Sequence, residues 1–280
     1  MKKNLLLSLA SMVLAGIPSV QAGTVKTLYS TLLDATNTDP LSLSYQASET
    51  SEFGAMIQLS GSGPFALTSA TVTLSNWGAE SAFETVGISS GFSLPMTLNI
   101  YGVGADDSVG ALINSLTFDA FVPWRPEADP GNCGAGSTQF LGSDGACHDA
   151  SLSTVTFNFD ISSALVPGQI IYGLVFNTSS YGPNPTGTTT PADSLNFAMA
   201  SDPPTTGDNP LPETAYWNTM NPGSYTDGGT AGVGIFRQDQ GWSPFSGAVE
   251  FTGIADAPEP SSLILIGLGL IGLGIRKIRR

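Results

Sequence analysis

Short runs in which apolar and polar residues alternate recur along the chain between its two ends. The clearest run has Val155, Phe157, Phe159 and Ile161 interleaved with Thr, Asn and Asp. A period of two places one side of a β-strand on a core and the other side in water. Further strands are predicted at Phe65–Ser75, Met96–Val103, Ile113–Val122, Gln169–Asn177, Leu195–Met199 and Ala248–Gly253. Outside the two ends, no stretch shows the 3.6-residue apolar period of an amphipathic helix.

Clusters of Gly, Pro, Asn and Asp separate these runs. Several short strands joined by such turns predict an all-β domain, an antiparallel β-sandwich or jelly-roll-like fold, over residues 23–256. Residues 201–232 are rich in Pro, Gly, Asn and Asp and are predicted to form a long loop packed down by Tyr216, Trp217 and Tyr225. No repeat with a fixed period is visible, which argues against a solenoid or a propeller.

Residues 1–22 have the three parts of a secretory signal peptide. Lys2 and Lys3 are followed by an apolar stretch from Leu5 to Ile17. Small residues then precede the junction between Ala22 and Gly23, where signal peptidase is expected to cut. The body is therefore predicted to fold outside the cytoplasm.

The C-terminal residues 257–280 also combine three parts. A triplet, Pro258, Glu259 and Pro260, precedes an apolar run that ends before a basic cluster made of Arg276, Lys277, Arg279 and Arg280. This arrangement closely resembles the PEP-CTERM sorting signal. The resemblance implies that an exosortase, a transpeptidase-like membrane enzyme, cuts near the triplet, and that the source is a Gram-negative bacterium that exports polysaccharide.

The physical properties of this tail agree with the resemblance. The prolines hold the triplet extended, where an enzyme at the membrane can reach it. The predicted transmembrane helix, about residues 261–276, is shorter than the roughly 20 residues of a comfortable span. The basic cluster behind it favours a cytoplasmic end. A tail removed after insertion and a lasting single-pass anchor both remain open. The glycines at 267, 269 and 272 match G-x-G-x-x-G but lie in this apolar run, without a preceding strand, so they do not predict a nucleotide site.

The charge distribution limits the partners of the body. Charged residues make up 11% of the chain, against a globular average of roughly 25%. The net charge is −14, and Lys26, Arg125 and Arg237 are the only basic residues between the tails. Such a body repels phosphate backbones, which argues against a nucleic-acid partner. Neutral sugars, divalent cations and other surface polymers remain compatible with it.

Two candidate sites involve Cys133, Cys147 and His148. The two cysteines flank a Gly-rich loop in an exported chain and predict a disulfide. A metal site that adds His148 lacks a clear fourth ligand. A second arrangement places Ser89 in a G-x-S-x-G motif with His148 as a distant partner. A hydrolase elbow requires a strand before the serine and a helix after it, whereas a strand pattern follows here.

Two further groups are candidates for ligand contacts. Trp124, Trp217 and Trp242 lie in loop-like sequence and could stack on sugar rings, although such residues more often pack a loop onto its domain. The acidic residues in turns give weak calcium candidates, at Asp106, Asp107, Asp202 and Asp208, without the spacing of a known calcium loop. No cofactor is expected.

The sequence therefore predicts a non-catalytic protein that is exported, sorted and delivered to the cell surface or extracellular matrix. Its body would associate with exopolysaccharide or the cell envelope, and the membrane would hold its tail before processing. A carbohydrate-binding module that uses the loop tryptophans is the first alternative. A serine hydrolase centred on Ser89 is the second.

Overall fold

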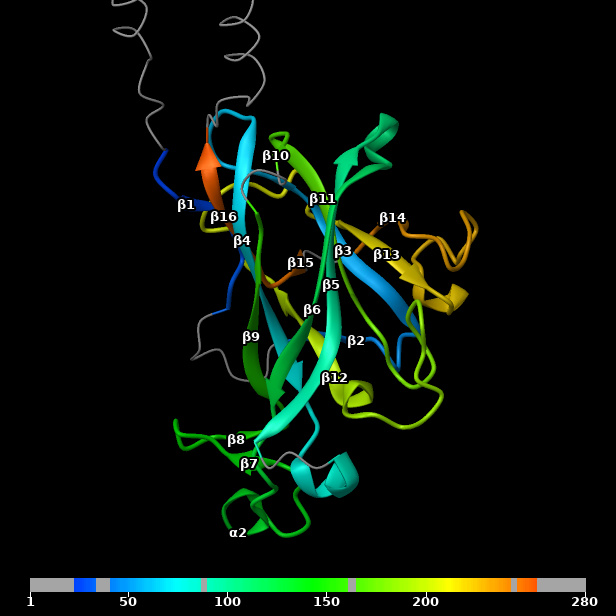
Figure 1. The fold of residues 1–280 in the computed structure, drawn as a ribbon. Helices are drawn as coiled ribbons and strands as arrows, with labels where there is room; N and C mark the ends of the chain where they lie inside the picture. Colours follow the sequence, from blue (N-terminus) through cyan, green and yellow to red (C-terminus); the bar gives the residue numbers. More distant parts are fainter. Residues whose placement is uncertain (1–22, 34–40, 87–89, 161–164, 243–245, 256–280) are drawn as a thin grey trace, which may run out of the picture. The chain divides into compact units, whose positions relative to one another are not determined.

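The computed structural model describes residues 23–33, 41–86, 90–160, 165–242 and 246–255. Residues Val25–Asp256 form one compact unit, in which two antiparallel sheets enclose a shared apolar core (Figure 1). The predicted all-β class and the sandwich-like arrangement are confirmed. The predicted signal peptide and transmembrane helix lie outside the described residues. Within the described residues, no helix is both long enough and apolar enough to span a membrane.

The larger sheet has eight strands among the described residues. Its main path runs β1 (Lys26–Ser30), β16 (Val249–Ala255), β4 (Phe65–Asn76), β12 (Leu195–Ala200) and β15 (Ser246–Gly247). Strand β2 (Ser42–Ser44) pairs with β12, while β9 (Ser151–Asn158) and β10 (Leu165–Val166) pair with β4. The long strand β4 therefore organises this sheet.

The second sheet has six strands. Their order is β14 (Arg237–Gln240), β13 (Thr214–Thr219), β3 (Thr50–Gln58), β11 (Gln169–Phe176), β5 (Gly91–Val103) and β6 (Val109–Pro123). Short 3-10 helices occur at η2 (Glu80–Val86), η3 (Ala105–Asp107), η4 (Pro191–Ser194) and η5 (Pro222–Ser224). A one-turn helix α2 (Pro130–Cys133) and a small hairpin of β7 (Phe140–Leu141) and β8 (Cys147–His148) form a separate excursion.

The alternating pattern of the sequence is reproduced in the core. Val155, Phe157 and Phe159 are all buried, while Ile161 lies outside the described residues. Phe157 of the eight-stranded sheet meets Phe118 of the six-stranded sheet edge to face, with ring centroids 4.9 Å apart. Aromatic contacts of this kind stabilise a core beyond the burial of their area. In this protein the contact between Phe118 and Phe157 joins the two sheets.

Strand β3 was not among the predicted strands, yet it lies in the middle of the six-stranded sheet. Its residues Phe53, Ala55 and Ile57 are buried on the core side. Gly54 faces the other way, and a Cβ atom added there would lie 1.7 Å from the backbone oxygen of Tyr172 on β11. Only glycine permits so close an approach of two strands. The glycine that weakens the strand pattern in the sequence is therefore required by the fold.

Residues 201–232 differ from the continuous loop that the sequence predicts. Residues Thr214–Thr219 form β13, which pairs with β3 on one side and β14 on the other. The expected packing residues Tyr216, Trp217 and Tyr225 are indeed buried. The strand is short and lies among Pro, Gly, Asn and Asp residues, so local composition masks it. Its pairing with β3 decides its structure.

Candidate functional site

The disulfide predicted between Cys133 and Cys147 is present, with Cα atoms 5.7 Å apart. It links α2 to the β7–β8 hairpin. Asp129 caps α2 by accepting a hydrogen bond from the backbone nitrogen of Asn132 at 3.1 Å. Because both thiols form the disulfide, the alternative metal site with His148 is ruled out.

His148 is buried, and its Nε2 lies 3.0 Å from Asp144 Oδ1. The hydrogen bond with His148 holds the pKa of the Asp144 carboxyl below its usual value. Ser89 lies outside the described residues. The described elements around it are the 3-10 helix η2 before and strand β5 after. This order is the reverse of a nucleophile elbow, so the fold gives no support to the hydrolase alternative.

The three candidate tryptophans pack against the core. Trp217 is 3% exposed, its Nε1 donates to Thr50 Oγ1 at 2.9 Å, and its ring meets Phe53 edge to face. Trp124 is partly buried and stacks on Phe83, with centroids 5.7 Å apart. The structure gives no support to the alternative of a sugar contact by Trp217, because a ring so enclosed presents no face to a ligand. Trp124 and Trp242 act as clamps, each packed against the core.

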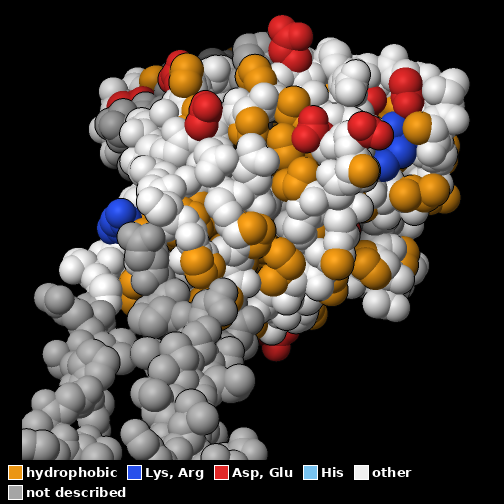
Figure 2. Space-filling model, turned by 90° about the horizontal axis from the view of Figure 1, so that it is seen from above, with side chains coloured by type: hydrophobic (Ala, Val, Ile, Leu, Met, Phe, Trp, Pro, Cys, Tyr) orange, Lys and Arg blue, Asp and Glu red, His pale blue; other side chains and the backbone are white. Residues whose placement is uncertain are grey.

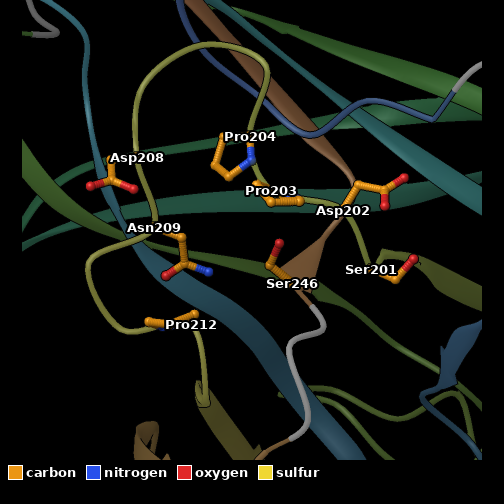
Figure 3. A pocket seen from close by; sticks show the side chains of 8 residues that line it. All are labelled: Ser201, Asp202, Pro203, Pro204, Asp208, Asn209, Pro212 and Ser246. Carbon is orange, nitrogen blue, oxygen red and sulfur yellow. The ribbon is translucent and has the colours of Figure 1, made fainter.

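The acidic calcium candidates lie in two places. Asp106 and Asp107 form the turn between β5 and β6 and have φ angles of 53° and 58°. Asp202 and Asp208 line one pocket of about 220 Å³ together with Asn209 and Ser246. The two residues lie on opposite sides of this pocket, and the Asp202 carboxylate points away from Asp208 (Figure 3). Among the described residues, no group of three or more His, Cys, Asp or Glu side chains is placed to hold a metal.

A polar pocket at the β14 edge of the six-stranded sheet is the most developed candidate site. We call it the loop site. It has a volume of about 440 Å³, and its lining residues come from the loop after β13 and from β14: Thr226, Asp227, Ala231, Arg237, Gln238 and Gln240. The two glutamines offer both donors and acceptors, and Gln240 is exposed. The lining can therefore hydrogen-bond to hydroxyl groups.

Arg237 holds the loop site together rather than presenting free charge. Its guanidinium lies 3.9 Å from the centre of the Tyr225 ring, and its Nη2 donates to Asp227 Oδ1 at 2.9 Å. Its Nε donates to the Gly232 oxygen at 2.8 Å. The hydrogen bond from Arg237 holds the pKa of the Asp227 carboxyl below its usual value. The opposite charges of Arg237 and Asp227 therefore largely neutralise each other within the site.

Buried Asp239 holds the loop site in place through hydrogen bonds. It is 1% exposed and accepts from the Thr226 nitrogen at 3.0 Å, from Thr226 Oγ1 at 2.7 Å and from Trp242 Nε1 at 2.6 Å. The Trp242 ring packs on Trp217, with centroids 5.1 Å apart. Two of the predicted tryptophans therefore support a polar site through Asp239. The sequence indicated these aromatic residues but not the polar residues around them.

A second polar group, around Glu52, was not predicted. Glu52 on β3 is 8% exposed, and its Oε1 accepts from Asn99 Nδ2 and from the Tyr101 hydroxyl, each at 2.9 Å. Its side chain crosses β11 at Gly173, where an added Cβ would lie 2.1 Å from Oε1. Burial raises the pKa of the Glu52 carboxyl, against the two hydrogen bonds. An isolated Glu in a strand gives no signal of this kind in the sequence.

Comparison with known proteins identifies the C-terminal tail. Residues 256–280 match the family described as the PEP-CTERM protein-sorting motif. These residues lie outside the described structure. A tail of this kind implies an exported protein that an exosortase processes and that passes through the membrane to the cell surface. Neither the curated proteins nor the solved structures yield a significant match to the chain.

Proposed function

We propose that the body is a non-catalytic protein of the cell surface or extracellular matrix that binds neutral exopolysaccharide through the loop site. The observation that carries this proposal is the PEP-CTERM tail at residues 256–280, which follows a β-sandwich with few basic side chains. Signal peptidase and exosortase are its proposed processing enzymes, and its molecular role lies in association outside the cell.

The chemistry of the loop site favours a neutral glycan over an anionic polymer. Gln238 and Gln240 supply amide donors and acceptors that suit sugar hydroxyls. Arg237 directs its donors to Asp227, Gly232 and Gln238 within the protein. Arg125 likewise donates to the backbone oxygens of Trp77 and Thr138. Figure 2 shows one face of the body, where Lys and Arg side chains are few and several Asp and Glu side chains lie among uncharged ones.

Affinity electrophoresis of the exported protein through gels that contain the host's exopolysaccharide tests the ligand. A double variant, Gln238→Ala with Gln240→Ala, should lose most of the retardation, about a tenfold weakening for two lost polar contacts. Asn184→Ala is the matched control, because it removes an exposed amide on a different loop. Equal retardation of the double variant and the wild type would refute the loop site as the contact surface.

The intact mass of the protein recovered from the host's surface and medium tests the sorting. We expect a chain that begins at Gly23 and ends near Pro260. A chain that retains Arg280 would show that the tail is a lasting anchor, and the proposal of a released or transferred matrix protein would fail. This outcome is independent of glycan binding.

A further inference from the structure

Strand β6 (Val109–Pro123) forms an open edge of the six-stranded sheet. It is 15 residues long and pairs with β5 on one side. On its other side it pairs with no strand in the described parts of the chain (Figure 1). An unpaired edge exposes a row of backbone donors and acceptors that can pair with another chain.

The sequence of β6 carries little of the usual protection of an edge. Proteins block edges with lysines, prolines, bulges, short strands or a covering segment. Strand β6 has one charged residue, Asp119, its proline is at the last position, and its bulge at Ile113 lies in its N-terminal half. Phe157 of β9 packs against Phe118, but β9 does not pair with β6. Strand β6 also carries two exposed apolar side chains, Leu112 at 54% and Phe121 at 49% exposure. The strand is therefore suited to pairing with a neutral partner strand.

A bulge places the two exposed apolar residues on the same side of the sheet. Thr117 pairs with Thr97, Ser115 with Asn99, and Leu112 with Tyr101, so Ile113 is the extra residue. Residues 115, 117, 119 and 121 share the outer face by alternation, and the bulge returns Leu112 to that face. Two apolar side chains thus flank a polar centre on the outer face of one edge strand.

We propose that two copies of this chain associate through β6, as antiparallel strands related by a two-fold axis at Thr117. Facing residues in such a pair lie on the same side of the sheet. Asp119 of one copy then faces Ser115 of the other. Through the bulge, Phe121 faces Leu112. The contact is self-complementary, as a two-fold interface requires.

Other registers fit less well. Centring the axis on Asp119 would place the two carboxylates directly opposite each other, which is destabilising. Centring it on Phe118 would set Phe121 against Ser115 and leave Leu112 unmatched. The Thr117 register combines apolar contact with separated charges. Association of two copies through β6 requires neither the sorting tail nor a glycan, so this proposal is independent of the function proposed above.

Cysteine cross-linking of the exported protein tests this register. Facing Cα atoms on neighbouring antiparallel strands lie about 4.5–5.5 Å apart, inside the disulfide range of roughly 4.4–6.8 Å. Thr117→Cys should therefore give a covalent dimer under mild oxidation. Thr156→Cys is the matched control: Thr117 shares a hydroxyl hydrogen bond with Thr97, and Thr156 shares one with Thr71. Both residues are exposed, but Thr156 belongs to β9 and should remain uncross-linked.

Sedimentation velocity provides a second readout that does not depend on new cysteines. The double variant Leu112→Lys with Phe121→Lys sets lysine against lysine in the dimer and should weaken association about tenfold or more. Met220→Lys, at a side chain that is 52% exposed and lies outside β6, should leave association unchanged. A monomeric wild type at all accessible concentrations would overturn the proposal. Equal cross-linking of the two cysteine variants, or no effect of the lysines, would overturn it as well.

Discussion

The two edges of the six-stranded sheet are built differently. Strand β14 has four residues, contains Arg237 and buried Asp239, and is tied to the loop after β13. Strand β6 has 15 residues, one charge, and partly exposed core-side residues such as Leu116 and Phe118. The first edge is closed by short polar contacts from its own chain, whereas the second is open. Stability should therefore depend strongly on side chains at β14 and little on those at β6.

The largest effect is expected at Asp239. Asp239→Ala removes the acceptor for Thr226 and Trp242 and leaves their donors without a partner. We expect a loss of about 3 kcal/mol in the free energy of unfolding, measured by urea denaturation. Asp239→Asn retains one acceptor oxygen and should lose clearly less. Equal losses for the two variants would contradict this role of the acceptor.

Arg237 should have the next largest effect. Arg237→Met keeps much of the apolar stem but removes the contact with the Tyr225 ring and the donor to the Gly232 oxygen. A loss of about 1–2 kcal/mol in the free energy of unfolding is expected. Arg237→Lys should recover part of it, since the charge over the ring remains. A variant with wild-type stability would show that the β14 edge is closed without Arg237.

Glu52 should change the pH dependence of stability. Its pKa in the folded protein is raised by burial above the ordinary value of 4.5, so the folded state binds the proton more tightly than the unfolded state. Stability is then lost as the pH rises above 4.5 through the folded pKa. Glu52→Gln should remove this decrease.

Glu127 provides a control for which the pH dependence of stability should have the opposite sign. Its pKa is lowered by hydrogen bonds from Ser81, so its contribution is lost as the pH falls below its usual value. Denaturant midpoints measured across the pH range for Glu52→Gln, Glu127→Gln and the wild type should separate the two. Identical pH profiles of the wild type and Glu52→Gln would contradict the raised pKa.

The smallest effect on folding is expected at the open edge. Leu112→Lys and Phe121→Lys each change a side chain that is about half exposed, and should alter the unfolding free energy of the monomer by less than about 0.5 kcal/mol. Thermal unfolding at dilute concentration measures this. A large loss would mean that β6 depends on these side chains for its own folding, and the contrast between the two edges would disappear.

The sequence predicted the elements whose pattern is local. Strands β4, β5, β6, β9, β11, β12 and β16 coincide with the predicted runs, because each alternates or is continuously apolar. The disulfide was predicted because its two cysteines flank one loop. Strands β3 and β13 were missed, since Gly54 interrupts one and turn residues surround the other. Their conformation depends on partners distant in the sequence.

The candidate sites, too, could be predicted only where their residues lie close together in the sequence. The tail could be recognised because its triplet, apolar run and basic cluster are contiguous. The polar residues of the loop site and of the Glu52 group come together only after the sheet forms, from β3, β5, β14 and the loop after β13. The sequence predicted that Trp217 packs a loop onto the domain, with sugar contact as an alternative, but it did not indicate which residues Trp217 packs against. Its partners Phe53 and Thr50 belong to another strand and place it in the core.

The scarcity of basic residues also affects how long the body survives outside the cell. Proteases that cleave after Lys or Arg find three such residues between the tails. Lys26 begins strand β1, Arg125 is followed by Pro126, and the Arg237 side chain is 11% exposed. Cleavage of a native chain requires local opening of the segment around the bond. The shortage of basic residues that disfavours anionic partners therefore also makes the body durable among secreted proteases of this specificity.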